Sequence, residues 1–178
     1  MKVEDKKLLT GLSERVEELS TPSMEKCVEK VYTWLETAGK AFGDESEIPT
    51  AIELIKEETS EFFEGLTTND KDEVLDGFAD AFFTLLNGAY FFGVTPEELN
   101  KKFEQVIASN YSKFCKDRGE AIKSCIKYKS GTHPNKPGVK INPMYRATGN
   151  SEYPFVILNA KTLKILKSIK YKEPNEFV

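Results

Sequence analysis

The chain has 178 residues, of which 39% are hydrophobic and 30% are charged. This balance is typical of a globular protein and excludes an intrinsically disordered chain. The most apolar stretch, residues 79–94, is interrupted by Thr84 and Asn87 and is too short and too polar for a membrane span, so no membrane partner is expected.

The N-terminus has no apolar run behind it, which argues against a secretory signal. There are three cysteines, Cys27, Cys115 and Cys125, and no two of them form a Cys-x-x-Cys pair. The odd number and the spacing argue against a disulfide framework and against a zinc site. A cytoplasmic location is therefore expected.

The net charge of −4 hides a strong asymmetry along the chain. Residues 1–100 contain 9 Lys and Arg against 23 Asp and Glu, whereas residues 101–178 contain 16 against 6. An acidic half is suited to holding cations, and a basic half to holding phosphates or an acidic partner. The alternative is a pair of oppositely charged, solvated faces that attract each other.

The first half of the chain predicts a series of helices. Residues 3–19 have a modest apolar face and predict a peripheral helix. A second helix is expected from Pro22 to about Phe42, and a third from after Pro49-Thr50 to about Phe63, with Gly65 and residues 67–70 as the break. The second helix repeats apolar residues every three or four positions, which predicts a buried face made of Met24, Cys27, Val28, Val31, Leu35 and Ala38.

A fourth helix is expected from about Lys71 to Phe92, and Gly93 is a good terminator for it. This helix is apolar on nearly all sides, which predicts that it is central in a bundle. The segment Thr95-Pro96-Glu97-Glu98 has the form of a capping box that begins a fifth helix. The apolar residues of that helix are Leu99, Phe103, Val106, Ile107, Tyr111 and Phe114.

The composition changes after Asp117-Arg118-Gly119. Residues 120–129 predict a short helix, and 130–137 a loop rich in Gly, Pro and Asn. The segments 139–141, 153–158 and 162–169 favour β structure, with 159–161 as a turn. The fold class is therefore mainly α, a helical bundle with a small C-terminal β hairpin or meander. The expected domains are a peripheral helix (1–20), the bundle (21–118) and a basic α+β appendage (119–178).

Two neighbouring helices carry carboxylates at helical spacing. The third has an EExxE arrangement of Glu57, Glu58 and Glu61, and residues three or four apart share a helix face. The fourth carries Glu73, Asp76 and Asp80 among Leu, Phe and Ala, where an unpaired carboxylate is costly to bury. Hard divalent cations take oxygen ligands of this kind, often shared with substrate phosphates.

A solvated acidic face is the simpler interpretation of the EExxE run taken alone. Di-iron bundles use Glu-x-x-His motifs, and the only histidine is His133, in a loop. The same lack of histidine argues against zinc catalysis and Ser-His-Asp chemistry.

Four segments in order resemble one superfamily. They are EExxE at 57–61, the run from Glu73 through Asp80, the segment Ser109–Lys113, which looks like an SNMSK motif, and the tail from Lys164 to Pro174, which looks like GKVLKSxxYxPP. The chain resembles the all-α NTP pyrophosphohydrolases, which include MazG, dimeric dUTPases and phosphoribosyl-ATP pyrophosphohydrolase. The last two segments are similar to the phosphoribosyl-ATP-pyrophosphohydrolase-like branch of phages and bacteria. Gly77 departs from the superfamily pattern, because it stands where a glutamate is usual.

The resemblance implies a MazG-like four-helix bundle core that hydrolyses a (d)NTP to (d)NMP and pyrophosphate with Mg²⁺, or Mn²⁺ as a substitute. The implied metal ligands are Glu58, Glu61, Glu73, Asp76 and Asp80. The implied catalytic residues are Glu57 and Glu58, with Glu57 as the non-ligating base. Which of Glu73, Asp76 and Asp80 contact the metal is left open. The implied substrate contacts are Asn110, Lys113 and Lys167.

The resemblance also implies a homodimer or homotetramer, and no stable nucleic-acid partner. A phage-encoded protein would act in the host cytoplasm. Two alternatives stay open: phosphoribosyl-ATP pyrophosphohydrolase of histidine synthesis, and a helical binding or regulatory protein without the chemistry. The sequence does not indicate the preferred base, nor which of Trp34, Tyr32, Phe103 or Tyr111 would stack on it.

Overall fold

The computed structural model describes residues 24–177. The chain divides into two compact units, Met1–Asn100 and Lys101–Val178, and each is described by itself. The helix predicted over residues 3–19 lies outside the described part of the chain. The expected domain limits at residues 20 and 118 stay predictions.

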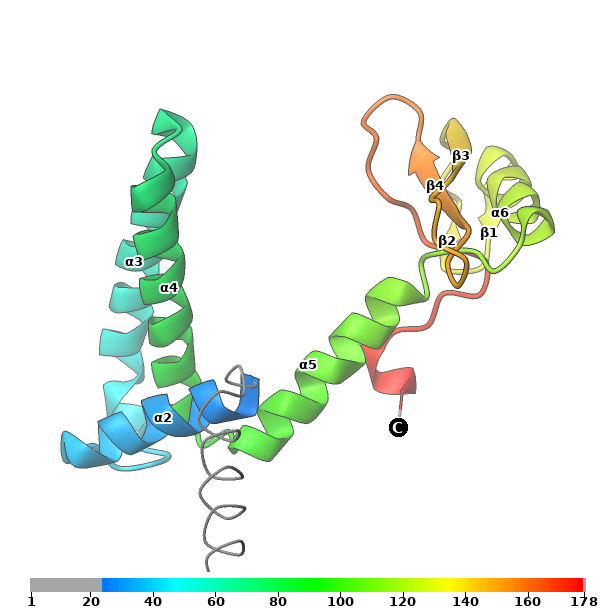
Figure 1. The fold of residues 1–178 in the computed structure, drawn as a ribbon. Helices are drawn as coiled ribbons and strands as arrows, with labels where there is room; N and C mark the ends of the chain where they lie inside the picture. The colour runs from blue at the N-terminus through cyan, green and yellow to red at the C-terminus, as the bar shows by residue number, and fades with distance from the viewer. Residues whose placement is uncertain (1–23, 178) are drawn as a thin grey trace, which may run out of the picture. The chain divides into compact units, whose positions relative to one another are not determined.

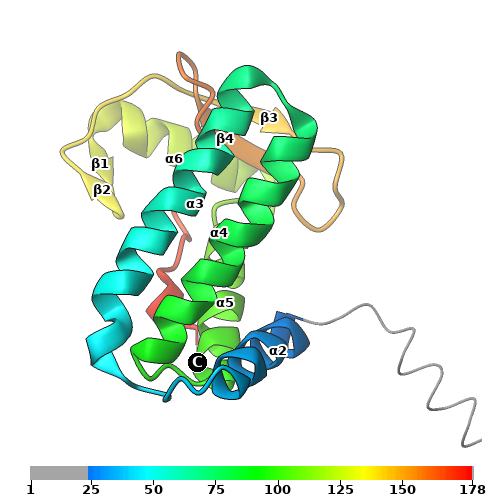
Figure 2. The same cartoon turned by 90° about the vertical axis from the view of Figure 1, so that its left-hand side faces the viewer.

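The first unit is helical (Figure 1). Its elements are α2 (Met24–Thr37), the short 3₁₀ helix η1 (Glu45–Glu47), α3 (Ile48–Thr68), α4 (Lys71–Phe91) and the start of α5 (Pro96–Tyr111). In Figures 1 and 2, α3 and α4 lie side by side as an antiparallel hairpin, and α2 lies across one end of it. The predicted limits of the fourth helix are confirmed to within one residue.

Two buried glycines bring the backbones of α3 and α4 close together. A Cβ atom at Gly77 would lie 2.7 Å from the backbone nitrogen of Phe62, and one at Gly65 would lie 2.8 Å from that of Val74. The prediction that Gly65 belongs to a break was wrong, because it lies inside α3 and faces α4. The helix ends five residues later than predicted, where Asn69 takes a left-handed φ of 57°.

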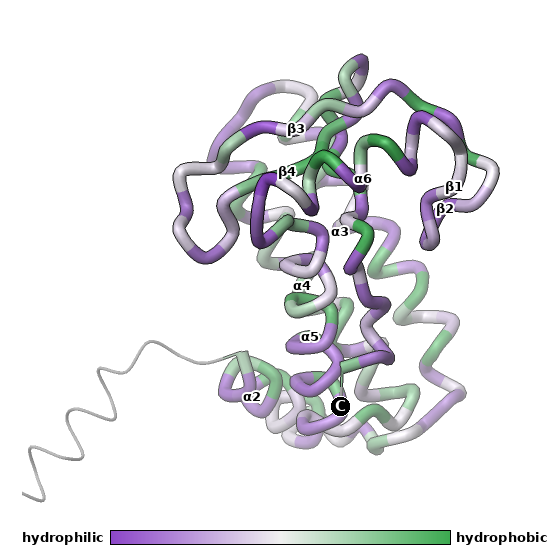
Figure 3. The backbone as a smooth tube through the Cα atoms, turned by 90° about the vertical axis from the view of Figure 1, so that its right-hand side faces the viewer, coloured by the Kyte–Doolittle hydropathy of each residue, from purple (hydrophilic) through white to green (hydrophobic). Residues whose placement is uncertain are grey.

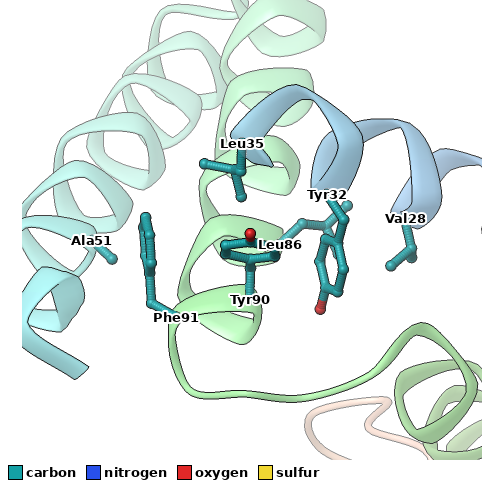
Figure 4. Packing of buried hydrophobic residues seen from close by; sticks show 7 residues of the cluster. All are labelled: Val28, Tyr32, Leu35, Ala51, Leu86, Tyr90 and Phe91. Atoms are coloured by element: carbon teal, nitrogen blue, oxygen red, sulfur yellow. The ribbon is translucent and has the colours of Figure 1, made fainter. Parts of the chain in front are cut away.

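The core of the first unit forms where α2 packs on the hairpin (Figure 4). Two tyrosines organise it: their rings meet edge to face at 5.0 Å, the Tyr32 hydroxyl donates to the Val94 carbonyl at 2.8 Å, and the Tyr90 hydroxyl donates to the Lys40 carbonyl at 2.9 Å. Buried tyrosines usually satisfy their hydroxyls in this way. The cluster consists of Val28, Tyr32, Leu35, Ala51, Leu86, Tyr90 and Phe91.

The end of α2 differs from the prediction. The helix stops at Thr37 rather than near Phe42, because Gly39 adopts a left-handed φ of 75°. Its buried face includes Tyr32, which the prediction omitted, and excludes Ala38, which is exposed.

The start of α5 was predicted correctly. The Thr95 N–H donates to the Glu98 carboxylate at 3.0 Å, and the Glu98 N–H donates to the Thr95 hydroxyl at 3.2 Å, which is a capping box. Gly93 precedes it with φ 77°, as expected of a helix terminator. The apolar side chains predicted for α5 are largely exposed; the exposed ones are Phe103, Val106, Ile107 and Tyr111.

The second unit combines the rest of α5 with α6 (Arg118–Ser130), two strand pairs and the 3₁₀ helix η2 (Pro174–Glu176). Strands β1 (Thr132–His133) and β2 (Lys136–Pro137) form one antiparallel pair, and β3 (Pro143–Ala147) and β4 (Phe155–Asn159) form the other. The consecutive hydrophobic residues of β4 appear as a green stretch in Figure 3, and Ile157 at its centre is fully buried. Ile157 packs with Cys115, Ala121 and Cys125.

The β segments were predicted only in part. The strand expected at 153–158 and the turn at 159–161 correspond to β4 and the turn after it, but the prediction of a strand at 139–141 was wrong. Residues 162–169 form only an isolated bridge between Leu158 and Ile165, because Leu163 has a left-handed φ of 57°.

The expected class, mainly α with a small C-terminal β hairpin, is confirmed. None of the helices between residues 24 and 177 has both the length and the hydropathy that crossing a bilayer requires.

Candidate functional site

The EExxE segment lies in the middle of α3. Glu58 is half-buried, whereas Glu57 and Glu61 are exposed. Partial burial, and then the negative charges of Glu61, Asp80 and Glu57, raise the pKa of the Glu58 carboxyl above its ordinary value. The structure therefore brings Asp80 of α4 within electrostatic reach of the EExxE segment, as the sequence predicted.

The close packing of α3 against α4 determines how near the carboxylates of the two helices lie to each other. A Cβ atom at position 77 would lie 2.8 Å from the Phe62 Cα atom and 3.2 Å from the carbonyl carbon of Glu61. A glutamate at this position, as the superfamily pattern has, does not fit against α3. The departure at Gly77 thus has a structural cause, which is the close contact of the two helices that carry the carboxylates.

Glu73 and Asp76 lie nearer the N-terminus of α4 than Asp80 does. Glu73 is in the first turn of α4, where its N–H donates to the capping carboxylate of Asp70 at 3.2 Å. Seven residues separate Glu73 from Asp80, about 10 Å along a helix axis. Neither Glu73 nor Asp76 is among the charges that shift the pKa of Glu58. Within residues 24–177, no three His, Cys, Asp or Glu side chains are arranged to hold a metal ion.

The carboxylates of α4 are not buried within the described chain. Asp76 and Asp80 are exposed, and so are the apolar residues beside them: Leu75 is 57% exposed and Phe78 59%. The expected burial among apolar side chains is therefore absent in the described chain, because this face of α4 is uncovered within the first unit.

In the second unit, four lysines line a cavity of about 430 Å³, here called the lysine pocket. Lys113 and Lys167, two of the predicted substrate contacts, lie there together, and no residue lining the cavity is acidic. The lining residues are Lys113, Tyr128, Lys136, Val139, Ile141, Asn159, Lys164, Ile165, Leu166 and Lys167. Such a concave and positively charged surface is suited to phosphate groups.

Lys167 is held firmly in this pocket. Its ammonium group is 2.5 Å from a Glu173 carboxylate oxygen and 3.9 Å from the centre of the Tyr171 ring. Partial burial lowers the pKa of Lys167, but the hydrogen bonds and electrostatic interactions with Glu173 and Tyr171 together outweigh it, so the pKa lies above its ordinary value. The ammonium is thus positively charged at neutral pH.

Asn110 lies beside the lysine pocket without lining it. Its amide nitrogen donates to the Val106 carbonyl at 2.8 Å, and its amide oxygen accepts from the Lys113 ammonium at 2.6 Å. The side chain is exposed, so the expected penalty for burying an amide beside Val106 is absent. Asn110 instead holds Lys113 in place.

Serine side chains join the SNYSK segment to the C-terminal tail, in a contact here called the serine clasp. The Ser109 hydroxyl donates to the Lys172 carbonyl at 2.8 Å, and the Lys172 N–H donates to the Ser112 hydroxyl at 3.0 Å. The hydroxyl of Ser168, which is fully buried, donates to the Ser112 carbonyl at 2.9 Å. Two segments that the sequence singled out separately therefore form one structural unit.

Sequence reasoning missed two of the four lysines that line the lysine pocket. Lys164 lies in the tail motif, where its position three residues before Lys167 was a usable signal. Lys136 is the first residue of β2, and no local pattern marks it. Of the aromatic residues considered for base stacking, Tyr32 is buried in the core, and Trp34 is 55% exposed, packed edge to face on Phe83.

A helical hairpin with carboxylates on both helices is the arrangement that the resemblance to the MazG-like, all-α NTP pyrophosphohydrolases implies. A model of the family described as phosphoribosyl-ATP pyrophosphohydrolase matches residues 36–107. The match begins at the end of α2, contains α3 and α4, and includes most of α5. It confirms the predicted superfamily resemblance for this segment.

The matched segment is less than half of the 178 residues, and it ends before the SNYSK segment and the tail. No curated protein and no solved structure matches the chain. The match indicates a nucleotide pyrophosphohydrolase.

Proposed function

We propose that the protein hydrolyses a nucleoside triphosphate between its α and β phosphates, giving a monophosphate and pyrophosphate. The observation that carries this is the placement of Glu58 opposite Asp80 in a segment that matches a pyrophosphohydrolase family. Like charges that raise a carboxyl pKa are an unfavourable arrangement that a bound cation relieves. The residue types therefore fit a hard divalent ion such as Mg²⁺, with Mn²⁺ as a substitute.

In this proposal Glu58, Glu61 and Asp80 hold the cation, with Glu73 and Asp76 as further candidates. The cation, when bound, neutralises charge on the phosphates. Glu57 is exposed and lies next to the group, which suits it to take the proton from the attacking water. The water oxygen bonds to phosphorus, the anhydride bond breaks, and pyrophosphate leaves.

The lysine pocket is the proposed binding surface for phosphate groups. Lys113 and Lys167 each supply a positive charge there, and Asn110 positions the former. Lysine acts as a point charge toward phosphate and tolerates several orientations of it. Lys136 and Lys164 are added to the predicted set on the basis of the cavity lining.

We also propose that the protein is a homodimer or homotetramer. The helices of the first unit leave many large apolar side chains uncovered; they are Ile52, Phe63, Leu66, Leu75, Phe78, Leu85 and Phe92. Exposed apolar surface of this extent is typical of association faces. A partner covering α4 would also desolvate Asp76 and Asp80. Light scattering that shows an active monomer would contradict this.

The test is pyrophosphate release from the four dNTPs, the four NTPs, dUTP and phosphoribosyl-ATP, with Mg²⁺, Mn²⁺ or EDTA. We expect metal-dependent release and a ranking among the bases. Glu58→Gln and Asp80→Asn should each lower kcat by at least about a hundredfold. Glu53→Gln is the matched control, because Glu53 is exposed on the same helix and pairs only with Lys56 at 2.9 Å.

Two results would count against the proposal. Turnover that survives in EDTA would exclude the metal. Equal activity in wild type, Glu58→Gln and Asp80→Asn would place the chemistry elsewhere. Release from phosphoribosyl-ATP alone would replace the triphosphate substrate and leave the carboxylate assignment in place.

A further inference from the structure

Three aromatic rings of the second unit form the wall of another cavity, of about 350 Å³, here called the aromatic pocket. The Tyr111 and Tyr153 rings are 4.8 Å apart between centroids, and the Phe114 ring is 5.8 Å from that of Tyr153. Tyr111 is 49% exposed, although tyrosine rings in a cluster are usually covered. An aromatic wall open to solvent is a surface on which a flat ring can stack.

Positive charge surrounds this wall. Lys116, Lys170 and Lys172 line the same cavity, and the Lys116 ammonium lies 4.4 Å from the centre of the Tyr153 ring. The only acidic residue in the lining, Glu120, has a side chain that is 3% exposed. Its carboxylate accepts the Lys116 N–H at 3.2 Å and lies 3.8 Å from the Lys170 ammonium. The accessible charge of the cavity is therefore positive.

The aromatic wall and the positive charge together indicate which kind of ligand the aromatic pocket binds. Stacking on aromatic side chains favours a planar base, and ammonium groups favour phosphate oxygens. The cavity volume is at the lower end of the range for small-molecule sites, which suits a single nucleotide better than a larger molecule. The Lys116 ion pair with Glu152 spans 4.0 Å between exposed groups, so a phosphate can compete for this ammonium.

We propose that the aromatic pocket is a nucleotide-binding site that takes a nucleoside phosphate, with the base on Tyr111 and Tyr153 and the phosphate near Lys116 and Lys172. No residue that lines it also lines the lysine pocket. The site is additional to the proposed hydrolysis and does not depend on it.

The test is isothermal titration of the full chain with 2′-deoxyadenosine 5′-monophosphate in EDTA, where metal-dependent turnover is absent. The separate halves of the ligand, 2′-deoxyadenosine and 2-deoxyribose 5-phosphate, are titrated in parallel. We expect the nucleotide to bind at least about tenfold more tightly than either half, because both the stacking and the charge contribute.

Tyr153→Ala should weaken the binding by about tenfold or more, because it removes a stacking surface, and Tyr153→Phe should restore it. The double variant Lys116→Gln and Lys172→Gln should weaken it by about tenfold or more. Its matched control is Lys123→Gln with Lys161→Gln, which removes the same charge from exposed lysines outside both cavities. Circular dichroism checks that each variant is folded.

Three outcomes would overturn the proposal. The first is a Kd that stays within about twofold of wild type in both Tyr153→Ala and the lysine double variant. The second is loss of binding in Lys167→Gln alone, which would assign the nucleotide to the lysine pocket. The third is binding of a single-stranded deoxyadenosine oligomer with no binding of the mononucleotide, which would indicate a nucleic-acid surface.

Discussion

Replacing Gly77 by alanine tests the packing that positions the carboxylates. The added methyl group would lie 2.7 Å from the Phe62 nitrogen and 2.8 Å from its Cα atom. Backbone atoms cannot rotate away, so α3 and α4 must separate locally. Overpacking of a core costs about 1–3 kcal/mol, and we expect the upper end here. Removing a helical glycine returns about 1 kcal/mol. The expected net loss is about 2 kcal/mol.

Gly88→Ala in the same helix is the matched control. A Cβ atom there would meet only the Ile55 Cδ1 atom, at 3.2 Å, and the end of a flexible side chain can move. We expect this variant to be as stable as wild type or more stable, by up to about 1 kcal/mol.

The assay is unfolding by urea and by heat, followed by circular dichroism at the helical band. The expected loss for Gly77→Ala corresponds to a Tm lowered by about 4–8 °C. Wild-type stability in Gly77→Ala would refute the close-contact argument. An equal loss in Gly88→Ala would show that any alanine in α4 is harmful and that the contact with Phe62 is not the cause.

Three further predictions concern the second unit. Burial raises the pKa of the Cys115 thiol to about 12, so at pH 8 iodoacetamide should label the half-buried Cys27 well before Cys115, as read by peptide mass spectrometry. The hydrogen bond from Lys167 lowers the pKa of Glu173. The stabilising effect of this bond is present above the ordinary carboxyl pKa and is lost as pH falls through the lowered value. An NMR titration of Lys167→Gln should therefore show a higher Glu173 pKa than in wild type. Ser168→Ala removes a buried hydroxyl that donates one hydrogen bond and accepts another. This variant should lower the free energy of unfolding, measured by urea titration, by about 1–3 kcal/mol. Unchanged stability would count against the serine clasp.

The sequence predicted those features of the fold that depend on local chemistry. The capping box at Thr95 and the limits of α4 follow from residues adjacent in the chain, and the structure has them where expected. The end of α2 was misplaced because two glycines, Gly39 and Gly43, compete as terminators, and both adopt left-handed φ values. Gly65 was misread because its role is set by Val74 on another helix.

The candidate site was predictable to the same degree. Helical spacing on α3 and α4 was enough to expect Glu58 and Asp80 together. The lysine pocket also contains Lys136, whose place depends on how the chain folds back after α6. Spacing along a sequence does not report which segments meet when helices and strands lie between them.

The serine clasp has a consequence for the order of folding. The hairpin of α3 and α4 joins neighbouring segments, so it can form as soon as residue 91 has emerged from the ribosome. The clasp joins residues 56 to 63 positions apart and needs Lys172. Closing so long a loop is slow relative to local pairing. During translation the acidic helices should therefore be in place while the lysine-rich unit is still open, because the clasp forms only after Lys172 has emerged from the ribosome.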